Sequence, residues 1–276
     1  PVLDALQAAD VVLAVGTELG ETDTLLFDDQ LQLSGKVIRI DIEPEQITRN
    51  VLPEVSICAD AGLAMKALSV ALSEFKPFEH QAEVAELRKA ADELAPAAYR
   101  QHGRLMDLVA ETLPGAVIAG DSTQPVYGAN LFYEAEAPRR FFNSSTGYGT
   151  LGYGLPAALG AKLALPDSPV VSLIGDGGLQ FSIAELATAV ELKLAVPVLV
   201  WNNSGYGEIK RYMLERDIPT IGVDIYTPDF ITIARGFGCE ACQVTSRDEL
   251  IQALIDAHQA NGPTLIDIPE DLALDW

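Results

Sequence analysis

Two side chains suited to holding a metal ion, Asp176 and Asn203, each follow an apolar stretch and lie 27 positions apart. The stretches 169–174 and 196–201 are apolar runs of the kind that form buried strands of a parallel sheet. Because the carboxyl ends of parallel strands meet at one edge of a sheet, we expect Asp176 and Asn203 to lie close together. One carboxylate and one amide oxygen suit Mg²⁺, which takes few protein ligands and completes its octahedron with phosphate oxygens and water. The spacing therefore predicts a magnesium site at this edge.

The glycines around Asp176 indicate that this magnesium ion is shared with a phosphate group. Gly175, Gly177 and Gly178 surround Asp176, and residues without a Cβ allow a backbone to approach a ligand closely. Free backbone N–H groups in such a turn bind phosphate oxygens. The pattern therefore predicts a diphosphate held through Mg²⁺. The alternative is that Asp176 and Asn203 simply close two βα turns of the fold.

The elements that position these residues form one strand–helix–strand unit. Between the two expected strands, Ser182 and Glu185 form the S-x-x-E pattern of a helix capping box. Apolar residues then recur with helical spacing, and they are Ile183, Leu186, Ala187, Val190 and Leu194. The sequence thus predicts a helix that begins near Ser182 and covers the sheet.

Helical and strand patterns alternate along the whole chain, which is typical of an α/β fold. We expect two doubly wound parallel-sheet domains, the first incomplete, at residues 1–75 and 101–276 with a linker at 76–100. The expected strands are 11–15, 36–42, 117–119, 139–142, 169–174, 196–201, 239–244 and 264–268. The expected helices are 3–9, 61–72, 82–94, 104–113, 155–165, 183–194, 229–236 and one capped by Ser246 and Glu249.

The composition excludes several classes of function. The chain carries a formal net charge of −22, so neither nucleic acids nor anionic membranes are expected partners. No apolar run approaches the roughly 20 residues of a membrane span, and an acidic cytoplasmic enzyme fits this composition. Three cysteines do not make a disulfide framework in a chain of this size. The three histidines lack the pattern of a hydrolase triad.

The G-D-G motif at 175–177, followed by Asn202-Asn203, resembles the signature of enzymes that use thiamine diphosphate. The resemblance extends over the whole chain, which is similar to the C-terminal half of acetolactate-synthase-like thiamine diphosphate enzymes. Residues 1–75, with the segments VVLAVG and KVIRIDIEP, resemble part of the central domain of that family. Residues 101–276 resemble its complete diphosphate-binding domain.

This resemblance implies roles for particular residues. It implies that Asp176, Asn203 and the carbonyl of Gly205 bind Mg²⁺. It implies cofactor contacts by the residues Ser122, Thr123, Gln124, Gly149, Leu151, Gly175, Gly177, Gly178 and Tyr206. The carbonyl of Gly149, in the segment GYGTLGYGLPAA that starts at Gly147, would accept from the 4′-amino group of the cofactor. Leu151 would be the wedge that bends the cofactor, so Gly149 and Leu151 are the residues expected to serve catalysis.

The implied activity is decarboxylation of a small 2-oxo acid, which ends in an aldehyde or in carboligation to a second carbonyl compound. The cofactor supplies the reactive carbon and the electron sink, while the protein binds and orients it. The resemblance also implies a homodimer or homotetramer and a pyrimidine-binding domain that carries the activating glutamate. No part of this chain resembles that domain. Because the chain begins at Pro1 without methionine, we interpret it as a piece of a longer protein that is inactive alone.

Three alternatives stay open. Acetolactate synthases usually carry an arginine-containing flavin loop where this chain has residues 16–20, Gly-Thr-Glu-Leu-Gly, so FAD is a poorly supported additional cofactor. The segments NNSGYGEIKRYM and IPTIGVDIYTPDF are more similar to decarboxylases for 5-guanidino-2-oxopentanoate, whose guanidinium would pair with Glu208, Asp217 or Asp224. In an acidic chain each of these acids is more simply explained as a surface charge. A non-catalytic diphosphate-binding module is the third alternative, although a wedge at Leu151 favours an enzyme.

Overall fold

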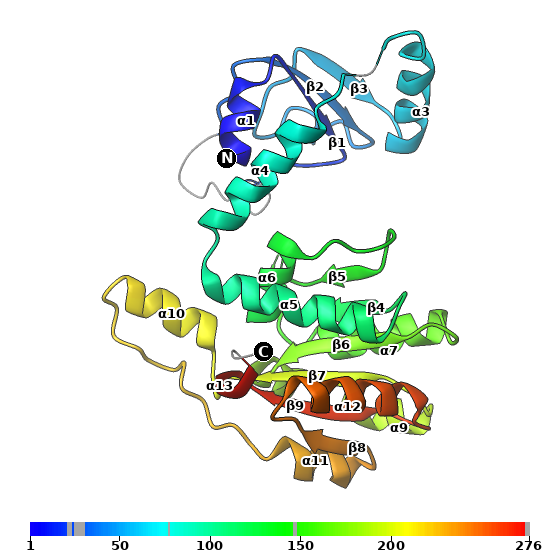
Figure 1. Ribbon diagram of the computed structural model, residues 1–276, viewed down its shortest axis with the longest axis vertical. Helices are drawn as coiled ribbons and strands as arrows, with labels where there is room; N and C mark the ends of the chain where they lie inside the picture. The colour runs from blue at the N-terminus through cyan, green and yellow to red at the C-terminus, as the bar shows by residue number, and fades with distance from the viewer. Residues whose placement is uncertain (21–23, 25–30, 77, 146–147, 274–276) are drawn as a thin grey trace. The chain divides into compact units, whose positions relative to one another are not determined.

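The computed structural model describes residues 1–20, 24, 31–76, 78–145 and 148–273. The chain divides into two compact units, residues 1–94 and 95–276. Each unit has a parallel sheet with helices between its strands (Figure 1), which confirms the α/β class expected from the sequence. Within these described ranges, no helix combines the length and the apolar character needed to cross a bilayer.

The first unit is built on a three-stranded parallel sheet in the order β1-β2-β3. Its elements are α1 (Val2–Ala8), β1 (Val11–Val15), β2 (Lys36–Asp41), β3 (Val55–Cys58), α3 (Ala61–Ala71) and α4 (Gln81–Leu94). The sequence analysis missed β3 because all four of its residues are exposed and show no inside–outside alternation. The buried apolar side chains of β1 and β2 are Val12, Ala14, Val37 and Ile40. With a core this small, individual polar contacts weigh more in the stability of this unit.

One such contact involves Arg39, a cation on β2 that is only 1 % exposed. Its guanidinium donates hydrogen bonds to the carbonyl oxygens of Thr17, Arg49 and Val51. Thr17 follows β1, whereas Arg49 and Val51 precede β3. Planar guanidinium groups present several donors in a fixed fork, so one side chain fastens two loops at the end of the sheet.

We expect Arg39→Met to lower the free energy of unfolding of the first unit by at least about 2 kcal/mol, because each hydrogen bond to a charged group contributes about 1.5–3 kcal/mol. Amide hydrogen exchange in β1 and β2 measures this loss. The control is Arg49→Met, whose ion pair with Glu18 (3.3 Å) is more than half exposed and is worth about 0–1 kcal/mol. Equal exchange rates in the two variants would show that Arg39 does not fasten the loops.

The second unit holds a six-stranded parallel sheet in the order β5-β4-β6-β7-β9-β8. Its strands are β4 (Val117–Gly120), β5 (Phe141–Asn143), β6 (Val170–Gly175), β7 (Pro197–Asn202), β8 (Glu240–Gln243) and β9 (Thr264–Pro269). Its helices are α5 (Ala97–Thr112), α6 (Gln124–Phe132), α7 (Gly154–Ala164), α8 (Asp176–Ser182), α9 (Glu185–Glu191), α10 (Gly207–Glu215), α11 (Phe230–Phe237), α12 (Arg247–Gln259) and α13 (Glu270–Ala273).

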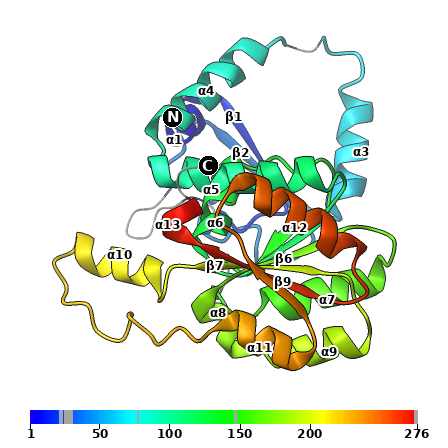
Figure 2. The same cartoon turned by 60° about the horizontal axis from the view of Figure 1, so that its bottom comes forward.

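Helices cover both faces of this sheet, as Figures 1 and 2 show. Buried side chains of α5, α6 and α12 form one core layer, and those of α7, α8, α9 and α11 form the other. Successive residues of each strand face opposite layers: in β4, Ile118 belongs to the first layer while Val117 and Ala119 belong to the second. Each fully buried aliphatic side chain stabilises such a fold by about 1.5–3 kcal/mol, so the double-sided core makes this sheet a rigid support.

The chain changes direction across this sheet between β4 and β6. From β4 it continues outward to β5, and from β6 it continues to β7 on the other side. The helix after β4, α6, packs in one core layer, whereas the helix after β6, α8, packs in the opposite layer. The two connections therefore diverge and leave a crevice at the carboxyl ends of the strands, which is where open α/β sheets bind ligands.

Two expected helices differ in the structure. The helix predicted at 104–113 is α5, which already begins at Ala97, so the expected linker 76–100 contains α4 and the first turn of α5. The helix predicted to start at Ser182 is instead two helices. The first, α8, begins at Asp176 directly after the strand and ends at Ser182, and α9 begins at Glu185 without a side-chain cap. The capping box at Ser182 and Glu185 is therefore wrong, because the glycine turn had already started a helix.

Candidate functional site

A cavity of about 180 Å³ lies at the crevice between β4 and β6. The site residues predicted from the sequence all line it: Ser122, Thr123, Gln124, Gly149, Leu151, Gly175, Asp176, Gly177, Gly178, Asn203, Gly205 and Tyr206. Tyr127, Gly207, Glu208 and Ile209 also line it and were not among the predicted cofactor ligands. Gly147, the first residue of the segment predicted to lie beneath the cofactor, falls outside the described residues. The structure thus brings together four segments that are far apart in the sequence.

Each segment reaches the cavity from the end of a strand. Residues 122–124 follow β4, residues 175–178 end β6 and begin α8, and residues 203–206 follow β7. The strands β6 and β7 are paired in parallel, with Gly175 opposite Trp201, which places Asp176 and Asn203 at the same edge. The fourth segment, 149–151, comes from the connection between β5 and α7.

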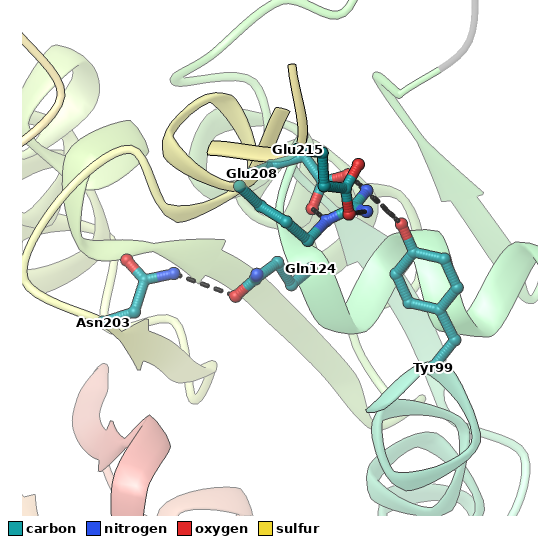
Figure 3. Close-up of polar contacts among 6 residues, drawn as sticks. Tyr99, Gln124, Asn203, Glu208 and Glu215 are labelled. Atoms are coloured by element: carbon teal, nitrogen blue, oxygen red, sulfur yellow. Dashed lines mark hydrogen bonds and ion pairs between the residues drawn. The ribbon is translucent and has the colours of Figure 1, made fainter. Parts of the chain in front are cut away.

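The side-chain amide of Asn203, the carbonyl of Gly205 and Oδ1 of Asp176 lie together, and their oxygens form what we call the three-oxygen cluster. In one orientation of the amide, its Nδ2 donates to Gln124 Oε1 at 2.9 Å (Figure 3), and its oxygen then faces the carbonyl of Gly205 and Oδ1 of Asp176. In the other orientation the nitrogen takes the place of the oxygen and donates to Gly205 O at 2.9 Å and Asp176 Oδ1 at 3.2 Å. Acceptor oxygens this close need either a donor or a cation between them.

The chemistry of these three groups fits Mg²⁺. A carboxylate, an amide oxygen and a backbone carbonyl are hard oxygen ligands, and Mg²⁺ uses few of them because phosphate oxygens and water complete its shell. A different kind of metal site would need several histidine, cysteine or acidic side chains together, and no group of three lies within reach of one ion in the described part of the chain. The donor set is therefore one for a hard divalent cation that a ligand helps to bind.

The burial of Asp176 also favours a bound cation beside its carboxylate. Asp176 is 1 % exposed, and this burial raises the pKa of its carboxyl group, although a hydrogen bond from Thr227 and the backbone N–H groups of Gly177, Asn203 and Gly205 favour the ionised form. Thr227 Oγ1 donates to Oδ2 at 3.1 Å, which leaves Oδ1 directed at Asn203. A divalent cation would compensate the buried charge that desolvation disfavours.

Glycines on both sides of Asp176 keep the backbone accessible from the cavity. A Cβ on Gly177 would lie 2.7 Å from the ring of Tyr206, and a Cβ on Gly178 would lie 3.0 Å from Oδ1 of Asp121. A side chain at Gly177 would therefore collide with the ring of Tyr206, and one at Gly178 would press against the carboxylate of Asp121. The bare backbone of this turn is what a diphosphate requires for close approach.

Asp121 is a buried residue of the site region that the sequence analysis did not single out. It is fully buried, and its carboxylate accepts hydrogen bonds from the backbone N–H of Ser122 at 2.9 Å and of Gly154 at 2.8 Å. It thereby joins the loop after β4 to the start of α7. Its position directly after an apolar strand, the same as that of Asp176, was the signal that could have identified it.

The turn that carries Gly149 and Leu151 has a backbone conformation that glycine permits. Gly149 has φ +59° and Gly152 has φ +81°, and a Cβ on Gly152 would lie 2.8 Å from Cβ of Phe181. Ser144 Oγ donates to the carbonyl of Thr150 at 2.6 Å and holds the turn against the end of β5. The half-buried Leu151 is thus presented to the cavity from a fixed backbone.

Behind the cavity, α5 places His102 against the sheet. His102 is 2 % exposed, its ring meets Trp201 edge to face at 5.2 Å, and neither ring nitrogen has a hydrogen-bond partner among the described residues. Burial lowers the pKa of His102 to about 4. The imidazole is therefore neutral at physiological pH and acts as an aromatic packing element.

This lowered pKa makes the second unit sensitive to acid. An unfolded histidine has a pKa of about 6.5, so the unfolded chain binds the extra proton between pH 6.5 and 4 and stability falls as pH drops through that window. We expect His102→Phe to flatten this part of the stability profile. Urea unfolding at several pH values, followed by tryptophan fluorescence, measures the free energy of unfolding of the variant and of the wild type. Subtracting one pH profile from the other removes the contribution of the carboxylates, which both proteins share. Identical pH slopes would contradict the assignment.

Comparison with known proteins identifies the family. Residues 121–268 match the C-terminal TPP binding domain of thiamine pyrophosphate enzymes, and residues 1–68 match the central domain of these enzymes; thiamine pyrophosphate is another name for thiamine diphosphate. The first match alone covers more than half of the chain. The chain therefore belongs to the thiamine pyrophosphate enzymes, which confirms the resemblance found in the sequence.

Within this family the chain is similar to decarboxylases and to acetolactate synthases. It is 39 % identical over 272 residues, 97 % of this chain and 48 % of the relative, to the probable 2-ketoarginine decarboxylase AruI of Pseudomonas aeruginosa. It is 33 % identical over 289 residues, 96 % of this chain and 43 % of the relative, to a probable chloroplastic acetolactate synthase 2 of Oryza sativa subsp. japonica. The chain spans about half the length of these curated relatives.

A solved structure supports the fold. The thiamine diphosphate-dependent 4-hydroxybenzoylformate decarboxylase of Rhodococcus jostii RHA1 superposes with a TM-score of 0.74 at 23 % identity, over 97 % of this chain and 50 % of that one. At this level of identity the likeness concerns the fold alone.

Proposed function

We propose that the chain supplies the diphosphate- and Mg²⁺-binding half of a thiamine diphosphate-dependent enzyme that decarboxylates a 2-oxo acid. The observation that carries this proposal is that one cavity is lined by every predicted cofactor residue and holds the three-oxygen cluster of Asp176, Asn203 and Gly205. Family membership gives the cofactor, and the donor set supports Mg²⁺ as its metal.

In this proposal each group has a defined task. Asp176, Asn203 and the carbonyl of Gly205 would hold Mg²⁺, and the bare turn at 177–178 would take the diphosphate together with residues 122–124 and Tyr206. The carbonyl of Gly149 would accept from the pyrimidine amino group, and Leu151 would hold the bend between the two rings. When bound, the cofactor supplies a nucleophilic carbon and an electron sink, so the protein's work is binding, orientation and exclusion of water.

The same proposal includes the domain that would complete the cofactor site and the oligomeric state of the protein. The chain spans about half of its curated relatives, so we assign the pyrimidine-binding domain and its activating glutamate to a segment outside these 276 residues. We further propose a homodimer or homotetramer, as the family resemblance implies. The acidic composition supports a cytoplasmic location.

Two reactions remain candidates. Carboligation to an acetohydroxy acid is favoured by the similarity to acetolactate synthases, at 33 % identity for the rice protein. Decarboxylation of 5-guanidino-2-oxopentanoate, which is 2-ketoarginine, is favoured by the 39 % identity to the probable 2-ketoarginine decarboxylase over 97 % of the chain. The presence of the carboxylate of Glu208 in the cavity lining leads us to prefer the second.

The test uses the full-length gene product with thiamine diphosphate and Mg²⁺. CO₂ release from pyruvate and from 5-guanidino-2-oxopentanoate is followed, and the products are identified. We expect turnover of the guanidino acid to an aldehyde; an acetohydroxy acid from pyruvate would establish the carboligase instead. Binding of ADP in preference to thiamine diphosphate, without CO₂ release from either acid, would favour the non-catalytic module and overturn the proposal.

A further inference from the structure

The described residues that line the cavity include negatively charged side chains and no positively charged ones. The cavity's only charged lining residues in the described part of the chain are Asp176 and Glu208, and no lysine, arginine or histidine lines it. Asp176 belongs to the three-oxygen cluster, so Glu208 is a second, separate carboxylate. It lies in the first turn of α10, immediately after the loop that carries Asn203 and Gly205. Any group of a substrate that extends toward α10 therefore meets a carboxylate.

The two carboxylate oxygens of Glu208 accept different numbers of hydrogen bonds. Oε1 accepts from the hydroxyl of Tyr99 at 3.1 Å and from Nη2 of Arg211. Among the described residues, Oε2 accepts only a long 3.4 Å contact from Nε of Arg211. Since each carboxylate oxygen accepts about two hydrogen bonds, Oε1 is filled while Oε2 keeps capacity for a further donor.

Arg211 neutralises Glu208 only in part. Its Nη1 also binds Glu215 Oε1, at 2.5 Å, so one guanidinium serves two carboxylates. The same guanidinium donates to the hydroxyl of Tyr99 at 3.0 Å and lies over the ring of Tyr212 at 4.9 Å. Figure 3 shows Tyr99 and Glu208 pointing toward each other from their separate elements. These contacts fix the Glu208 side chain, which is 17 % exposed, at the cavity wall.

The other acidic residues considered from the sequence do not share this position. Asp224 is paired with Lys210 at 2.6 Å and is mostly exposed, and Asp217 is exposed. Neither lines the cavity. Of the three candidates for meeting a substrate cation, only Glu208 has both access to the cavity and a fixed geometry.

We propose that Glu208 determines substrate specificity by binding, through Oε2, a cationic group at the far end of the 2-oxo acid side chain, with Tyr99 and Arg211 as positioning residues. This inference rests on the proposed function and deepens it. A fork-shaped guanidinium fits a carboxylate better than a single ammonium does. An anionic side chain would meet repulsion, and a neutral one would give Oε2 no charged donor.

The kinetic test compares the full-length protein with its Glu208→Gln variant, using 5-guanidino-2-oxopentanoate and the neutral 2-oxohexanoate. We expect Glu208→Gln to lower kcat/KM for the guanidino acid by about ten- to hundredfold, mainly through KM, as the loss of one charge-assisted hydrogen bond predicts. The neutral acid is expected to change by less than about threefold. Equal losses for both acids, or an unchanged ratio, would overturn the proposal.

The matched control is Glu215→Gln, which removes another carboxylate partner of Arg211 on the same helix but does not line the cavity. It is expected to leave the ratio of the two substrates unchanged; a shift as large as that of Glu208→Gln would assign the effect to α10 as a whole. Glu208→Asp, which keeps the charge, is expected to retain part of the preference.

Binding of 5-guanidinopentanoate, which lacks the 2-oxo group and cannot react, gives a readout without turnover. Calorimetry should show that this compound binds the wild-type holoenzyme more tightly than pentanoate does, and that Glu208→Gln removes the difference. Loss of thiamine diphosphate binding in Glu208→Gln would place the residue in the cofactor site and overturn the inference. Absence of cofactor binding and of CO₂ release in the wild type would instead refute the proposed function itself.

Discussion

Replacement of Asp176 by asparagine is expected to weaken Mg²⁺-dependent binding of thiamine diphosphate by about a hundredfold or more. Asp176 is the only carboxylate in the three-oxygen cluster, so the variant removes the only full negative charge from the proposed metal site. Even residues outside the ligand shell of a metal cost about 10- to 100-fold in affinity when they are replaced. Titration of the full-length protein with thiamine diphosphate at fixed Mg²⁺ measures the dissociation constant.

The stability of the cofactor-free protein separates this effect from unfolding. Burial already disfavours the ionised form of Asp176, so removal of its charge should leave the Tm unchanged or raise it. Asp217→Asn is the control, because it deletes an equal charge at an exposed position outside the cavity and should bind the cofactor normally. Unchanged affinity in Asp176→Asn would show that the metal site lies elsewhere.

Replacement of Gly205 by alanine is expected to destabilise the protein by about 1–3 kcal/mol and to weaken cofactor binding at least about tenfold. The added Cβ would lie 2.5 Å from the carbonyl oxygen of Val223, and backbone atoms cannot swing aside as a flexible side chain can. The adjacent hydrogen bond from Tyr206 N to the same oxygen, at 2.9 Å, would be disturbed. The carbonyl of Gly205, a proposed metal ligand, would move with it.

Gly160→Ala is the matched control for the same chemical change. Gly160 lies within α7, and a Cβ there meets nothing within 4 Å, so alanine should stabilise the helix by about 0.5–1 kcal/mol. Thermal unfolding and cofactor titration on both variants give the comparison. If Gly205→Ala matches Gly160→Ala in both measurements, the close approach of the two segments plays no part in the site.

Local patterns predicted most of the second unit because its strands are buried on both faces and its turns carry specific residues. The expected strand at 196–201 is β7 within one residue at each end. Two S-x-x-E patterns show where this reasoning succeeds and fails. Ser246 accepts from Glu249 N at 3.2 Å, and Glu249 accepts from Thr245 N at 2.8 Å, so a cap forms at α12 as expected. At Ser182 the same pattern lies at the end of α8, because that helix starts from the preceding strand.

Contacts between segments that are far apart in the chain could not be predicted from local sequence patterns. The sequence located Asp176 and Asn203 because each follows a strand and parallel strands end at one edge, and its resemblance to the family added the other cavity residues. It gave no sign that Tyr99 meets Glu208, 109 positions away, because nothing near Tyr99 marks it as a polar partner. The same holds for Arg39, whose acceptors are backbone carbonyls and therefore have no sequence signature.

The side-chain amide of Asn203 can act as a hydrogen-bond donor or as a metal ligand, depending on which end faces Gly205 and Asp176. With its nitrogen directed at Gly205 O and Asp176 Oδ1, the amide supplies the donors that these oxygens need before a cation arrives. With its oxygen directed there, it supplies a ligand. A carboxylate at this position would offer acceptors only, and the empty protein would hold two like charges against each other. An amide instead lets the apoprotein finish folding and take up the proposed metal later, by rotation of one side chain.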